Sequence, residues 1–168
     1  MEANKIKIKT LCISITAIAF IEVVRIAISR DYFSPMVILG VVRALETGLI
    51  IWIVIFWGKG LSSIGLAPST MGHGLKKGLI WSAGFGLVTF FGFTALFLVD
   101  IDPLTLIRTP LPGKNNEIVF FFFIGGLVAP IAEEVFFRGI LYGFFRRWGG
   151  VPALILTTAI FVLAHPVF

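Results

Sequence analysis

The sequence is poor in cysteine and in charged residues, and each shortage excludes a class of protein. One cysteine, Cys12, stands among 168 residues, so a disulfide-stabilised scaffold is excluded. Charged side chains make up 14% of the residues, whereas hydrophobic side chains make up 58% and the mean hydropathy is +1.01. This balance excludes a soluble globular domain of this length and is typical of a multi-pass membrane protein.

Long hydrophobic runs predict the fold. A helix needs about 20 mainly apolar residues to span a bilayer. We expect an all-α, polytopic transmembrane helical bundle of about five spans, forming a single membrane domain over residues 1–168, with the last span cut by the chain end. The expected spans are Thr10 to Ser29, Met36 to Trp57, Leu75 to Val99, Ile118 to about Phe137, and Val151 onward.

The segments between these spans contain residues that break helices. Gly58 to Gly74 holds glycine, serine and proline, and Asp100 to Glu117 holds three prolines, so both are expected to be loops. His73 falls in the glycine-rich part of the first segment. We expect it to be a solvated loop residue with no part in a site.

Basic residues are unequally divided between the two sides of the expected bundle. With the N-terminus in the cytoplasm, nine lysines and arginines fall inside and three fall outside, as the positive-inside rule requires. We therefore expect a multi-pass protein of the cell membrane with a cytoplasmic N-terminus. The net charge of +5 comes largely from residues at helix ends that meet lipid, and it does not indicate a nucleic-acid partner.

Two acid–base pairs lie within the first two expected spans. Glu22 with Arg25 and Arg43 with Glu46 each have the i, i+3 spacing of neighbours on one helix. Both pairs lie about seven residues from the loop between the two spans, so they are at the same level and can also pair across helices. We interpret them as a structural ionic cluster, because an unpaired charge in a bilayer is costly.

A second group of charges has more acid than base. Glu134 and Arg138 are i, i+4 neighbours with the acid first, the favourable order for a pair on one helix. Glu133 is rotated by about 100° from Glu134 at 3.6 residues per turn and has no such partner. An ionisable residue at this depth is a candidate functional residue.

His165 is the expected partner of Glu133. The two residues lie 16 positions before and 16 positions after Gly149, so a helical hairpin that turns at Gly149-Gly150 brings them to equal depth. Phe161, one turn before His165, is expected to pack beside them. The pair is mid-membrane if Arg146 and Arg147 mark the boundary, and shallow if Arg138 does. Taken alone, His165 is better explained as a packing or hydrogen-bonding residue, and its match in depth to Glu133 weakens that explanation.

A carboxylate beside an imidazole in apolar surroundings suits hydrolysis. Glu133 can act as a general base and His165 can share its proton, so that together they activate water. The alternative is a divalent metal such as zinc bound by Glu133 and His165, although catalytic zinc sites typically have three protein ligands.

These residues resemble the motifs of the CPBP family of intramembrane proteases, which includes type II CAAX prenyl endopeptidases and bacteriocin-processing or immunity-associated membrane proteins. Glu133, Glu134 and Arg138 match its first motif, and Phe161 with His165 matches its second. The resemblance implies a partial protease domain whose motif-bearing part covers about residues 75–168. It also implies that Glu133 and His165 are catalytic, that Glu134, Arg138 and Phe161 brace the site, and that the substrate is a membrane-associated peptide or protein of prenylated or bacteriocin-like type.

Members of that family carry a later histidine and a following asparagine or aspartate on further helices. The sequence ends at Phe168, so we expect it to be C-terminally truncated. Two interpretations remain open, an intramembrane endopeptidase and a non-catalytic bacteriocin immunity or binding protein. A transporter or channel is less favoured, because the sequence has no pair of broken helices.

Overall fold

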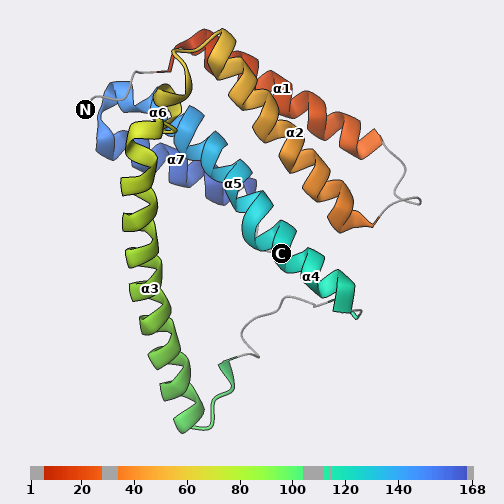
Figure 1. Cartoon of the computed structure of the whole chain (residues 1–168), viewed down its shortest axis with the longest axis vertical. Coiled ribbons are helices and arrows are strands. Elements are labelled where there is room, and N and C mark those ends of the chain that lie inside the picture. The colour runs from red at the N-terminus through yellow and green to blue at the C-terminus, as the bar shows by residue number, and fades with distance from the viewer. Residues whose placement is uncertain (1–5, 28–33, 104–111, 114, 166–168) are drawn as a thin grey trace. The chain divides into compact units, whose positions relative to one another are not determined.

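The computed structural model describes residues 6–27, 34–103, 112–113 and 115–165, and within them every regular element is helical (Figure 1). The all-α bundle predicted from the sequence is therefore confirmed. The chain divides into two compact units, one formed by residues 1–67 and 112–168 and the other by residues 68–111. That the two units make up a single domain stays a prediction.

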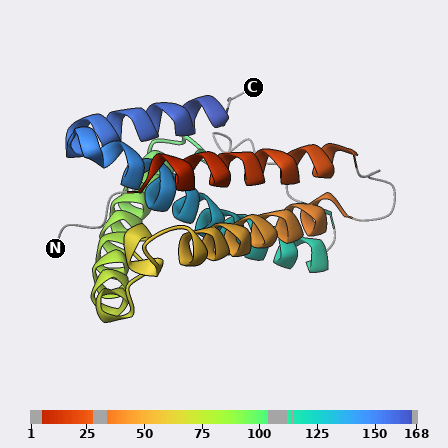
Figure 2. The same ribbon diagram turned by 90° about the horizontal axis from the view of Figure 1, so that it is seen from above.

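The first unit begins with two antiparallel helices, α1 (Ile8–Ala27) and α2 (Pro35–Phe56), which run side by side in Figures 1 and 2. Proline at the first position of α2 suits a helix start, because its missing N–H would have no partner there. Both helices are long and apolar enough to cross a membrane. The first two expected spans are confirmed.

A continuous helical segment from Asn115 to Trp148 forms the centre of the unit and extends beyond the predicted end near Phe137. The sequence between Phe137 and Trp148 contains charge and glycine but no proline, so nothing in it breaks the helix. The segment comprises α4 (Asn115–Phe123), η3 (Ile124–Val128), α5 (Ala129–Glu133), η4 (Glu134–Tyr142), α6 (Gly143–Phe145) and η5 (Arg146–Trp148).

Two stretches of this segment, η3 and η4, are π-helical. Pro130 has no N–H to donate to the carbonyl of Gly126, and its ring crowds that carbonyl, which accounts for the wider turn at η3. The second stretch, η4, begins at Glu134, directly after Glu133. Wide turns of this kind occur often at functional sites.

The chain reverses at Gly149, whose φ of 112° favours glycine, and continues as α7 (Gly150–Ala164). This helix packs against η4 and α6, so the hairpin predicted around Gly149-Gly150 is confirmed. At 15 residues α7 is an apolar helix shorter than the about 20 residues of a spanning helix, and a fifth span that starts at Val151 stays a prediction.

One end of the unit is held together by hydrogen bonds to backbone carbonyls of distant segments. The N–H of Ile6 donates to the carbonyl of Gly143 at 3.4 Å, and Arg147 Nη2 donates to the carbonyl of Ile6 at 3.0 Å. The hydroxyl of Thr10 donates to the carbonyl of Trp57 at 3.4 Å. The start of α1, the end of α2 and the end of the central segment therefore lie together. The buried core beside them consists of Ile6, Leu11, Ile50, Val54, Ile64, Val135, Ile140, Leu141 and Phe144.

The second unit contains α3 (Pro68–Leu98), which includes a fourth stretch of membrane-spanning length, Met71–Leu98. The prediction of a loop from Gly58 to Gly74 is wrong for its second half, because α3 already begins at Pro68. His73 is therefore a helical residue and not a loop residue, although its side chain is exposed as expected. Proline at the helix start and the apolar residues that follow outweigh the cost of Gly72 and Gly74 within the helix.

Candidate active site

The structure brings Glu133 and His165 together. Glu133 is the last residue of α5 and His165 directly follows α7, and His165 Nε2 lies 3.4 Å from Glu133 Oε1. Both side chains are partly accessible, at 27% for Glu133 and 43% for His165. The contact predicted from equal distances to the turn is confirmed, since α7 folds back along the segment that carries Glu133.

The ring of His165 is held in one orientation by Phe161. Nδ1 of His165 lies 2.9 Å from the carbonyl oxygen of Phe161, and the two rings stack with centroids 4.3 Å apart. A carbonyl oxygen only accepts, so Nδ1 carries the hydrogen and a neutral ring turns the lone pair of Nε2 toward Glu133. Two acceptors repel each other unless a proton or a water lies between them. The pair is thus arranged to exchange a proton.

Glu134 and Arg138 form the predicted ion pair, with Arg138 Nη1 2.9 Å from Glu134 Oε1. Both side chains are largely exposed, at 56% for Glu134 and 77% for Arg138. The pair therefore engages Glu134 and leaves Glu133 to His165, as the helical spacing indicated. That these two residues brace the site stays a prediction.

A cavity of about 680 Å³, here called the apolar cavity, opens between η4 and α7. Glu133 and Phe161 line it together with apolar side chains such as Phe137, Val151 and Leu154. Its volume is within the range of sites that bind small molecules or short peptide segments. A ligand in this cavity has direct access to the carboxylate of Glu133.

A smaller cavity of about 250 Å³, here called the polar cavity, lies on the other side of Glu133 and reaches α1 and α2. Glu133 and His165 line it together with Glu22, Arg43 and Glu46. The sequence analysis missed this arrangement, because the helical spacing that paired Arg43 with Glu46 says nothing of where α2 packs. The contact of α2 with α5 creates it.

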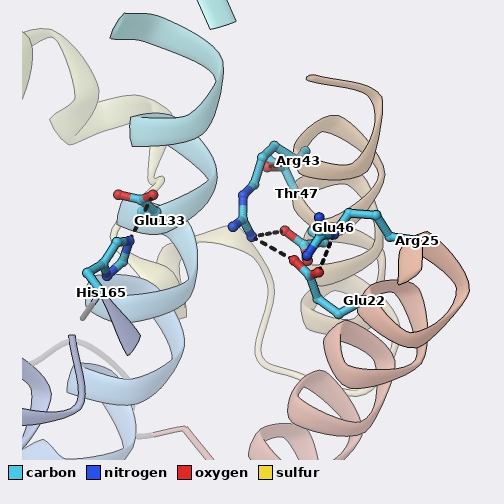
Figure 3. A network of polar contacts seen from close by, with 7 residues as sticks. All are labelled: Glu22, Arg25, Arg43, Glu46, Thr47, Glu133 and His165. Atoms are coloured by element: carbon cyan, nitrogen blue, oxygen red, sulfur yellow. Dashed lines mark hydrogen bonds and ion pairs between the residues drawn. The ribbon is translucent and has the colours of Figure 1, made fainter. Parts of the chain in front are cut away.

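The four charged residues of α1 and α2, Glu22, Arg25, Arg43 and Glu46, form the predicted ionic cluster (Figure 3). Arg25 pairs with Glu22 on α1, and Arg43 Nη1 lies 2.7 Å from Glu46 on its own helix and 3.5 Å from Glu22 across the helix interface. Both predicted pairs and the predicted cross-helix contact are confirmed. Figure 3 shows Arg43 reaching from α2 toward the helix that carries Glu133.

The donor atoms do not fit a catalytic metal site. Within the described residues, no group of three or more histidine, cysteine, aspartate or glutamate side chains is placed to hold an ion together. Glu133 and His165 supply two donors, whereas catalytic zinc sites typically have three from the protein. The roles proposed for Glu133 and His165 are those of their own side chains.

The fold and the site together define a helical membrane protein with an acid–histidine pair within its bundle. Residues 115–168, about a third of the chain, match the family model described as type II CAAX prenyl endopeptidase Rce1-like. No curated protein and no solved structure matches the chain. The matched segment contains the Glu133, Glu134 and Arg138 motif and the Phe161 and His165 motif, so the resemblance drawn from those residues is confirmed for this part of the chain.

Proposed function

We propose that the protein is an intramembrane endopeptidase of the CAAX protease type, in which Glu133 and His165 activate water. The observation that carries the proposal is the contact of Glu133 with His165, 32 residues away, at the edge of a cavity large enough for a peptide. The match of this segment to the Rce1-like family supports the same reaction class.

In the proposed reaction Glu133 accepts a proton from water as the water oxygen bonds to the carbon of a peptide carbonyl. The carbonyl π electrons move to its oxygen and leave a tetrahedral oxyanion. The oxyanion electrons then re-form the carbonyl as the carbon–nitrogen bond breaks, and the departing nitrogen keeps that electron pair and takes the proton held by Glu133 or His165. One water and one peptide bond become a carboxylic acid and an amine. His165, held by the carbonyl of Phe161, positions its Nε2 to share the proton.

We propose a membrane-associated substrate with an apolar group next to the cleaved bond. The apolar cavity offers aromatic and aliphatic walls, Phe137, Val151, Leu154 and Phe161, on the approach to Glu133. Burying an apolar chain there is favourable by about 25 cal/mol per Å² removed from water. A prenylated peptide or a hydrophobic bacteriocin-like peptide has this chemistry.

We also propose that the protein lies in the cell membrane with its N-terminus in the cytoplasm. The start of α1, the end of α2 and the end of the central segment lie together, and five basic residues are found near them: Lys7, Lys9, Lys59, Arg146 and Arg147. Basic residues gathered at one end of a bundle are typical of the cytoplasmic side.

The decisive experiment compares E133Q with E134Q, the same change at neighbouring positions. The probe is a prenylated C-terminal peptide with a fluorophore and a quencher on either side of the bond, assayed in liposomes. Loss of the general base is expected to lower hydrolysis by about 10²- to 10⁴-fold in E133Q. Glu134 is engaged by Arg138 and is not assigned to the water, so the loss in E134Q is expected to be at least tenfold smaller. Equal rates for E133Q and the unsubstituted protein would contradict the proposed protease and favour the alternative, a non-catalytic bacteriocin immunity or binding protein.

A further inference from the structure

The apolar and polar cavities meet at Glu133. Of the residues that line them, Glu133 and Phe137 are common to both, whereas His165 lines the polar cavity alone. The walls of the two cavities differ in their share of charge: the first has Glu133, Glu134 and Arg138 among mainly aromatic and aliphatic side chains, and the smaller second cavity has five ionisable side chains among six aliphatic or aromatic ones. Glu133 therefore lines both a large, mainly apolar compartment and a smaller compartment that is richer in charge.

Two polar atoms of the ionic cluster are buried next to the polar cavity. Among the described residues, Arg43 Nε and Glu46 Oε1 are buried with no protein hydrogen-bond partner. These two atoms have almost no accessible surface, but their residues line the polar cavity together with Glu22, Glu133 and His165, and a cavity with such polar walls is suited to hold ordered water. The cavity volume of about 250 Å³ has room for several waters at roughly 30 Å³ each.

Hydrolysis inside a bilayer needs water where the surrounding lipid has none. The apolar cavity suits the substrate, and an apolar substrate that fills it displaces water from that side of Glu133. The polar cavity is lined by Glu133 as well and also by His165. Water held there can approach Glu133 and His165 without crossing the substrate.

We propose that the ionic cluster maintains a water compartment that supplies the hydrolytic water to Glu133, with Arg43 and Glu46 as positioning residues. The inference rests on the proposed function for its catalytic part. A purely structural cluster needs the ion pairs between α1 and α2 and no more. The extension of Arg43 toward the Glu133 helix and the shared cavity with His165 go beyond that need.

The first test measures water in the compartment and does not depend on proteolysis. Cys12 is the single cysteine, so C12S gives a background for single new cysteines. Ile18 lines the polar cavity, whereas Phe20, two residues along α1, is 68% exposed on an apolar face. A thiol must ionise in water to react with a small charged methanethiosulfonate reagent. I18C in liposomes is expected to react with the reagent at least tenfold faster than F20C. If both variants react equally slowly, the polar cavity holds no accessible water and the inference is wrong.

The second test separates positioning from structure. In the I18C background, R43M is expected to lower the labelling rate about tenfold, because an apolar side chain removes the charge and the donors. In the protease assay R43M is expected to lower kcat at least tenfold and to leave KM within twofold, since the substrate lies in the other cavity. R43K keeps the charge with fewer donors. Its labelling rate and its kcat are expected to lie between those of R43M and those of the protein with Arg43.

Folding is checked by thermal unfolding in detergent, and R43K and E46Q serve as milder variants if R43M does not fold. Normal kcat and normal I18C labelling in folded Arg43 and Glu46 variants would overturn the positioning role. Fast I18C labelling together with an inactive unsubstituted protein would refute the proposed protease and leave the water compartment standing. The two failures are thus distinguishable.

Discussion

The ionic cluster of α1 and α2 and the Glu133–His165 pair both place charge within the helical bundle, yet they are built differently. The cluster combines two acids with two bases, and each acid has a base three residues away on its own helix. Glu133 has a single imidazole as its neighbour, 32 residues along the chain. The cluster satisfies its charges locally, whereas the pair depends on the fold.

Accessibility separates Glu46 from Glu133, whereas the other three residues of the cluster are 25% to 33% exposed, like Glu133. The side chain of Glu46 is 4% exposed, and that of Glu133 is 27% exposed. A carboxylate as buried as Glu46 cannot meet a peptide, while Glu133 can. Balanced charge is suited to holding helices and water in place, and a carboxylate that is accessible and has no cation beside it is suited to chemistry.

Replacing His165 with glutamine is expected to have the largest effect that follows from this contrast. Glutamine keeps hydrogen-bonding capacity but cannot exchange a proton at neutral pH, so the rate of peptide cleavage is expected to fall by about 10²- to 10⁴-fold. Thermal stability is expected to stay nearly unchanged, because His165 follows the end of α7 and is partly exposed. Single-turnover cleavage in liposomes measures the effect, and F161L serves as a control for lost ring packing. A rate within twofold of normal in H165Q would contradict the assigned role.

Removing Glu46 tests the other side of the comparison. E46A leaves the partly buried Arg43 without its closest partner, although Glu22 stays 3.5 Å away, and losing one partner of a partly buried polar pair costs about 1 to 3 kcal/mol. The free energy of unfolding in detergent is expected to fall by that order. Removal of both charges, in R43M combined with E46L, is expected to recover most of the loss, because no unpaired charge remains.

The same double variant sharpens the contrast between stability and activity. If the cluster also positions water, the double variant is expected to fold well and still cleave slowly. Full activity in the double variant would show that the cluster has a structural role and does not position water. Unchanged stability in E46A would mean that the ion pairs seen between α1 and α2 contribute little.

Much of the site follows from local spacing. The i, i+4 pair of Glu134 and Arg138 and the i, i+3 pairs of the cluster depend only on the geometry of one helix. The contact of Glu133 with His165 needs one further assumption, a turn at Gly149, and the positive φ of that glycine satisfies it. A hairpin with a short turn fixes the depth of both arms, so counting residues was sufficient.

The remaining features depend on packing between helices, which local patterns do not contain. The polar cavity arises where α2 meets α5, and the N-terminal segment is fixed by Arg147 bonding to the carbonyl of Ile6, 141 residues away. The early start of α3 and the extension of the central segment past Phe137 were missed for a different reason. Glycine and charge were read as ends of helices, although neither breaks a helix as proline does.

The smallest expected effect concerns Arg138, which carries charge at the site yet resembles neither group. Its side chain and that of Glu134 are largely exposed, and exposed ion pairs contribute about 0.2 to 1 kcal/mol. R138M is therefore expected to change the free energy of unfolding by less than about 1 kcal/mol and the cleavage rate by less than tenfold. Matched thermal unfolding and cleavage assays of R138M and H165Q measure both quantities. A loss of a hundredfold or more in R138M at normal stability would show that Arg138 contacts the substrate in the apolar cavity, which it also lines. The chemistry would then extend beyond Glu133 and His165 to the neighbouring ion pair.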